Sequence, residues 1–182
     1  MLRVLTVELR KLNRSLAAAL AVAAPGLIAV FTFFNVLRGK APQPWDMWMI
    51  GSLGIWAFFM LPMSVTALTA LVAQMEHSPR SWDHLRALPL RRWTLYAAKA
   101  VSVFLVVALM SVAVLVLSWT AVRLAVALKP QLDPTGVFET RTYLETVGRM
   151  YLAAVLLIAV QLWLALRFSS FVPGLVVGIG GT

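Results

Sequence analysis

Four long apolar stretches dominate the chain, and each is long enough to cross a lipid bilayer as a helix. A membrane-spanning helix needs about 20 mostly apolar residues. The stretches cover about residues 15–37, 48–73, 97–122 and 144–166, with short polar segments between them. Prolines inside the first two stretches predict a kink in each. The pattern therefore predicts an all-α fold, a polytopic transmembrane helical bundle that forms one domain over residues 1–182.

Two shorter patterned segments flank these spans. In residues 1–14, leucines recur on one helical face and basic side chains occupy the others, which predicts an amphipathic helix in the membrane interface. The apolar run continues to Leu37, which favours an uncleaved first span over a signal peptide. Residues 171–182 are apolar but too short to span. They are interpreted as a partial fifth span of a chain truncated at its C-terminus, or else as a short re-entrant or interfacial segment.

Composition narrows the class of protein. Apolar residues make up 61% of the chain and charged residues 13%, against roughly 45–50% and 25% in an average soluble domain. The chain is thus not expected to be an ordinary soluble enzyme or a disordered tail. The net charge of +9 comes from basic residues in the short segments between apolar runs. We interpret them as topology signals and lipid anchors, not as a nucleic-acid site.

The distribution of lysine and arginine predicts the orientation. With the N-terminus in the cytoplasm, ten of the 16 basic residues fall on the cytoplasmic side and six on the outer side, as the positive-inside rule favours. Candidates for an aromatic belt on the outer side are Trp45, Trp48, Trp119, Tyr143 and Tyr151.

Sequence signals for catalysis or cofactor binding are missing. There is no cysteine, and His77 and His84 match no zinc signature. No P-loop, H-E-x-x-H or G-x-S-x-G motif occurs, so no ATP site, metal site or catalytic centre is expected. The cores of the spans carry no ionisable residue, which disfavours an ion-coupled transporter. Asn35 and Gln161 are expected to form hydrogen bonds between helices.

The segment between the second and third spans carries the clearest indication of a function. Ser78 and Pro79 predict a helix start, as N-cap and first helical residue. Trp82, Leu85 and Leu88 then share one face, and Pro89 ends the helix. A short helix over 79–88 has two interpretations: an interfacial helix with aromatic anchors, or a docking helix for a cytoplasmic partner.

The residues of this segment also resemble a known family. The loop from Glu76 to Lys99 looks like the second-to-third-span loop of ABC-2 type transporter permeases. It is most similar to the lantibiotic or bacteriocin immunity group, and the N-terminal amphipathic helix resembles the connecting helix of that family. The matching positions are Glu76, Trp82, Leu85, Leu88, Pro89, Arg92, Tyr96 and Lys99.

This resemblance implies partners and roles. Such permeases pair as homo- or heterodimers and bind an ABC-type ATPase subunit, which holds the ATP, through the short helix. Trp82, Leu85 and Leu88 would pack in an ATPase groove, and Asp83 stands where a basic residue is common in the family. The residues implied in ATPase coupling are Glu76, Trp82, Asp83, Leu85, Arg86, Leu88, Pro89 and Arg92.

The resulting hypothesis is a permease subunit of an ATP-driven exporter in the bacterial cytoplasmic membrane, with a cytoplasmic N-terminus. It would move a peptide, a lipid or a drug-like molecule and contact membrane lipid. The alternative is a small membrane interaction or assembly protein without transport activity.

Overall fold

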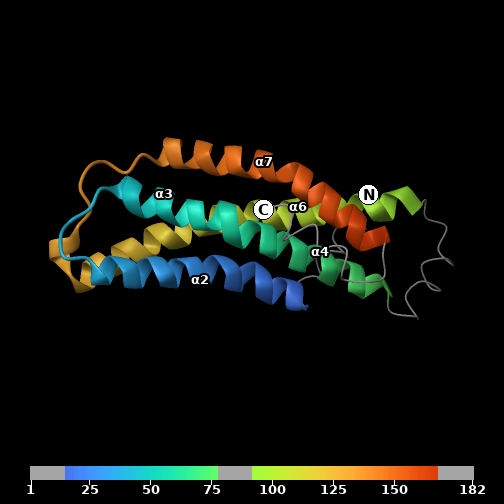
Figure 1. Cartoon of the computed structure of the whole chain (residues 1–182), viewed down its shortest axis with the longest axis horizontal. Coiled ribbons are helices and arrows are strands. Elements are labelled where there is room, and N and C mark those ends of the chain that lie inside the picture. The colour runs from blue at the N-terminus through green and yellow to red at the C-terminus, as the bar shows by residue number, and fades with distance from the viewer. Residues whose placement is uncertain (1–14, 78–91, 168–182) are drawn as a thin grey trace. The chain divides into compact units, whose positions relative to one another are not determined.

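The computed structural model describes residues 15–77 and 92–167. Among these residues it contains helices and connectors but no strand. The predicted interfacial helix at 1–14, the short helix at 79–88 and the partial span at 171–182 lie outside the described residues. The elements, drawn in Figure 1, are α2 (Leu16–Arg38), α3 (Trp45–Ile55), the π-helix η1 (Trp56–Met60), α4 (Leu61–His77), α6 (Arg92–Leu128), the 3₁₀-helix η2 (Pro130–Leu132) and α7 (Thr140–Arg167).

Four helical segments are long and apolar enough to cross a membrane. They are Leu16–Arg38, Trp45–Gln74, Tyr96–Leu128 and Thr140–Arg167, and the second consists of α3, η1 and most of α4. The predicted all-α polytopic bundle is therefore confirmed. The helices extend beyond the apolar stretches, because the flanking polar residues continue the same backbone hydrogen bonding. Thus α6 begins at Arg92, five residues before the predicted span.

The chain divides into two compact units, and each unit takes a part of every span. Unit 1 consists of Met1–Ala21, Pro62–Val107 and Ala154–Thr182. Unit 2 consists of Val22–Leu61 and Ala108–Ala153.

Unit 1 has an apolar core with hydroxyl groups buried in it. Val65, Leu68, Val103 and Ile158 are fully buried. Buried threonine and serine hydroxyls donate to carbonyl oxygens four residues earlier in their own helix, as Thr69 does to Val65 at 2.8 Å. A polar group in an apolar interior needs a partner of this kind.

Unit 2 is packed around Trp56, which is 1% exposed, and around Met49 and Leu53 of α3. Its outward faces carry large exposed apolar side chains, and Phe58 is 82% exposed. In water such surface would be unfavourable, whereas a bilayer solvates it. The packing is thus that of a membrane-embedded unit.

A π-helix stands where the sequence predicted a kink. Pro62 has no N–H group, and in an uninterrupted α-helix its ring would collide with the carbonyl of Phe58. In the structure the N–H of Leu61 bonds instead to the carbonyl of Trp56, five residues back. A new α-helix starts at Leu61, so Pro62 lies in its first turn, where no donor is needed. Pro25, by contrast, lies inside the uninterrupted helix α2.

Candidate functional site

The predicted ATPase-coupling residues lie at the edge of the described structure or outside it. Glu76 belongs to the last turn of α4 and Arg92 is the first residue of α6. The other six, Trp82, Asp83, Leu85, Arg86, Leu88 and Pro89, lie outside the described residues, as do the side chains of Glu76 and Arg92. The two helices therefore bracket the predicted coupling segment.

Close to this segment in the chain lies Lys99, a buried basic residue. Since α6 begins at Arg92, Lys99 lies two turns inside the helix, and it is only 5% exposed. The helix starts five residues before the apolar run that predicted the third span.

Polar contacts inside unit 2 join its helices. The hydroxyls of Thr32 in α2 and Ser52 in α3 lie 2.9 Å apart. Trp56 Nε1 donates to Ser111 Oγ in α6 at 3.1 Å. Asn35 was expected to bond between helices, but its Nδ2 donates to the carbonyl of Phe31 in its own helix at 2.8 Å. Small hydroxyl residues therefore make the interhelical bonds predicted for that amide.

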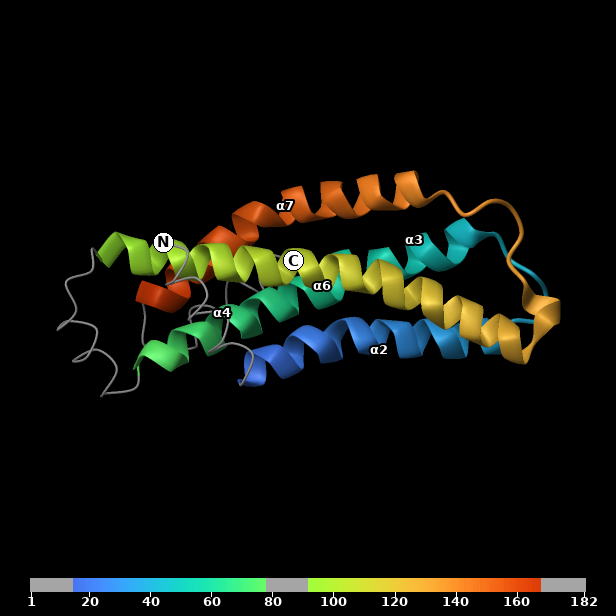
Figure 2. The same cartoon turned by 180° about the vertical axis from the view of Figure 1, so that it is seen from behind.

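Two connectors of unit 2, residues 39–44 and 129–139, lie side by side at one end of this unit (Figure 1). The opposite view shows the same arrangement (Figure 2). Pro44 and Thr135 form an isolated parallel bridge. Lys129 Nζ donates to the carbonyl of Leu37 at 2.9 Å. These bonds satisfy backbone groups at the helix ends and tie the two connectors together.

Beside these connectors lies a group of side chains that we name the connector cluster: Trp45, Trp119, Arg123, Asp133, Phe138, Tyr143 and Asp46. The guanidinium carbon of Arg123 lies 5.0 Å from the ring centre of Trp45 and 5.9 Å from that of Trp119. Arg123 Nη1 also lies 3.5 Å from Asp133 Oδ1. Phe138 packs edge-on against Trp45. Cation–π and ring contacts of this geometry are attractive.

The cluster corrects the aromatic-belt prediction for two residues. Trp45 and Tyr143 are buried, and the Tyr143 hydroxyl donates to Asp46 Oδ1 at 2.6 Å. Sequence reasoning found no role for Asp46, although it directly follows Trp45 at the start of α3. The pairing was invisible in the sequence because Asp46 and Tyr143 are 97 positions apart.

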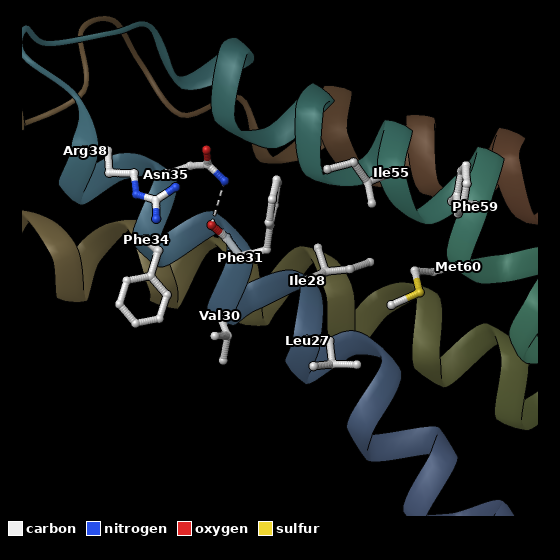
Figure 3. A pocket seen from close by; sticks show the side chains of 10 residues that line it. All are labelled: Leu27, Ile28, Val30, Phe31, Phe34, Asn35, Arg38, Ile55, Phe59 and Met60. Atoms are coloured by element: carbon white, nitrogen blue, oxygen red, sulfur yellow. Dashed lines mark hydrogen bonds between the residues drawn. The ribbon is translucent and has the colours of Figure 1, made fainter.

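Unit 2 carries an apolar groove of about 590 Å³, which we name the Arg38 groove. One wall is α2, from Leu27 to Arg38. The other wall consists of Ile55, Phe59 and Met60, at the end of α3 and in η1 (Figure 3). Arg38 and Asn35 lie together at one end, and all other lining residues are apolar. A volume of this size is typical of ligand sites, which measure about 300–1,000 Å³.

The comparison with known protein families matches nearly the whole chain. A family model described as ABC-2 family transporter protein matches residues 4–181. No curated protein and no solved structure shows a significant match. The family match agrees with the four apolar helices and with the resemblance of the 76–99 loop. The chain belongs to the ABC-2 family of transporter proteins.

Proposed function

We propose that this chain is the membrane-spanning permease subunit of an ATP-driven exporter and works with a separate ABC-type ATPase. The observation that carries the proposal is the family match over residues 4–181. Permeases of this family generally work with such an ATPase, and the four long apolar helices supply the membrane part. In this proposal ATP binds to the partner, and this chain contributes no catalytic group or cofactor.

The proposed coupling contact is the segment between α4 and α6. Trp82, Leu85 and Leu88 would fill a groove of the ATPase, and Asp83, Arg86 and Arg92 would orient it. Closure of an ATPase pair around ATP would move the helix at 79–88 and shift α4 and α6, which adjoin it in the chain. A second permease, identical or different, would complete the pathway. The substrate would be a peptide, lipid or drug-like molecule.

Changing the apolar face of the coupling segment should abolish ATPase binding. The double variant Trp82→Ala with Leu85→Asp removes an aromatic anchor and places a charge in a contact surface from which water is excluded. Loss of one such anchor weakens binding by about 2 kcal/mol or more, roughly 30-fold. Co-purification of the tagged chain with the co-expressed ATPase measures the effect.

The matched control is Trp163→Ala with Val137→Asp. Both residues are exposed and lie outside the coupling segment. This variant should retain the ATPase. Equal retention by both double variants would remove the coupling role of residues 79–88. Failure of the unmodified chain to bind any ABC-type ATPase would contradict the proposed function and favour an assembly protein.

The proposed orientation predicts the results of reporter fusions. A reporter that is active only outside the cytoplasm should be inactive when fused after Arg86 and active when fused after Gly136. The reason is the excess of lysine and arginine on the N-terminal side of the membrane. The reverse activities would overturn the cytoplasmic N-terminus and, with it, the coupling proposal.

A further inference from the structure

The Arg38 groove has one polar end and one apolar end. On α2, Leu27, Phe31, Phe34 and Arg38 follow one another at spacings of four, three and four residues, so they share one helical face. Figure 3 shows Arg38 and Asn35 together at one end of the groove, and Leu27 at the far end. Polarity therefore changes along the groove as it changes along a membrane lipid.

The length of the groove matches one leaflet. Leu27 and Arg38 are eleven residues apart, which corresponds to about 16 Å along a helix at about 1.5 Å per residue. Half of the hydrocarbon core of a bilayer measures about 15 Å. Arg38 is the last residue of an apolar 23-residue helix, so it belongs at the level of the headgroups. Leu27 then belongs near the bilayer midplane.

The cation at the polar end is available for a ligand. Arg38 is exposed, and none of the described residues forms an ion pair or a cation–π contact with it. Arg123 and Arg167, in contrast, both stack on tryptophan rings. A guanidinium offers paired donors that match the oxygens of a phosphate group. The charge thus complements an anionic headgroup.

The opposite wall of the groove depends on the π-helix. Phe59 and Met60 of η1 line the groove, and Phe59 stays 70% exposed. Its neighbour Phe58 is not part of the lining. Single π-helical turns inside helices are frequent at functional sites. The π-turn before Pro62 thus sets which aromatic ring faces the groove.

We propose that the Arg38 groove binds one acyl chain of an anionic phospholipid from the leaflet at the Arg38 end, with the lipid phosphate on the Arg38 guanidinium. Leaflet length, apolar lining and the cation at headgroup level all favour this occupant. The proposal goes beyond the permease function and holds for either orientation of the chain in the membrane.

The role of the Arg38 charge can be tested by native mass spectrometry of the full chain with added phosphatidylglycerol, which is anionic, or phosphatidylcholine, which carries no net charge. The unmodified chain should bind phosphatidylglycerol more tightly. Arg38→Gln should weaken that binding about fivefold, since one basic group at a membrane surface contributes about that factor. Lys40→Gln is the matched control: it removes the same charge two residues away, from an exposed side chain outside the groove. It should leave the affinity unchanged.

A second pair of variants tests the acyl-chain site. Phe59→Ala removes a ring from the groove wall and should weaken the binding of both lipids. Phe58→Ala removes an equally apolar, exposed ring of the same π-turn and should not. Equal effects of Arg38→Gln and Lys40→Gln, or of Phe59→Ala and Phe58→Ala, would overturn the proposal, because the lipid contacts would then be unspecific.

Other occupants of the groove give a different signal. The chain contains no cysteine, so Phe31→Cys introduces a single thiol in the groove. In oxidised membranes this variant should remain monomeric on non-reducing gels. A disulfide-linked dimer would place a second copy in the groove. A disulfide between Phe31→Cys and Val176→Cys in one chain would place the segment 171–182 there. Either result would overturn the lipid proposal.

Discussion

Replacing Trp56 by alanine is expected to lower the free energy of unfolding by about 3 kcal/mol. Trp56 is the largest fully buried side chain of the described structure and the first residue of η1. Removing a buried tryptophan from a core costs about 3–5 kcal/mol. The lower end applies here, because helices in a bilayer are held by packing contacts and not by exclusion of water. Titration with denaturing detergent, followed by tryptophan fluorescence, measures the change.

Two further variants separate the packing of Trp56 from its hydrogen bond. Ser111→Ala removes the acceptor of the Trp56 Nε1 bond and should cost about 0.6 kcal/mol, the average for hydrogen bonds between membrane helices. Ser118→Ala is the matched control in the same helix: Ser118 is buried, and its hydroxyl has no partner among the described groups. Its loss should be neutral or slightly stabilising. If Ser118→Ala were as costly as Trp56→Ala, the assignment of Trp56 as the packing centre of unit 2 would be wrong.

Replacing Arg123 by alanine is expected to cost about 2–3 kcal/mol of unfolding free energy. Two cation–π contacts contribute about 0.5–1 kcal/mol each at an exposed site, and more when partly desolvated. The ion pair with Asp133 adds up to about 1 kcal/mol. The aliphatic part of the side chain adds packing. The same detergent titration measures this loss.

The ion pair and the ring stacking of Arg123 respond differently to conservative substitutions. Asp133→Asn removes only the exposed ion pair, so it should cost less than about 1 kcal/mol and its effect should shrink in high salt. Arg123→Lys keeps the charge but loses the planar group that stacks on Trp45 and Trp119. It should retain part of the stability. An Asp133→Asn effect as large as that of Arg123→Ala would show that the ion pair, and not the stacking, holds the cluster.

The spans were predictable because their signal is local. A stretch such as 97–122 is apolar on every face, and length and hydropathy alone identify it as membrane-spanning. The helix ends were less predictable, as the start of α6 illustrates. Hydropathy marks only the apolar part of a helix, but α6 already begins at Arg92, because backbone hydrogen bonding does not require apolar side chains.

The ATPase-coupling residues were assigned from a short pattern and a family resemblance. Trp82, Leu85 and Leu88 share a face by their spacing alone, which predicts an amphipathic helix whatever surrounds it. Spacing does not reveal what covers that face. The identity of the partner came from the resemblance, and the family match over residues 4–181 agrees with it.

The connector cluster shows what the sequence did not reveal. Tyr143, Trp45 and Trp119 were interpreted as lipid anchors, because aromatic residues near span ends commonly are. Arg123 was interpreted only as one of the basic residues on the outer side. Its contact with Trp119 is local, four residues apart in α6, but its contact with Trp45 joins positions far apart in the chain, and no local pattern encodes such a pairing. The carboxylate partner of the buried Tyr143, Asp46, became visible only when α3 and α7 were placed together in unit 2.

The sequence by itself determined that the chain is an all-α membrane protein, because apolar length is a property of consecutive residues, and the resemblance of its 76–99 loop indicated the ABC-2 family. The tertiary structure alone decided which aromatic side chains are buried, and where the Arg38 groove lies. The groove needs α2 beside the π-turn at Trp56–Met60, which precedes Pro62 and accommodates its missing N–H. The proline is a local feature of the sequence, but only the packing of two helices made this turn the wall of a site.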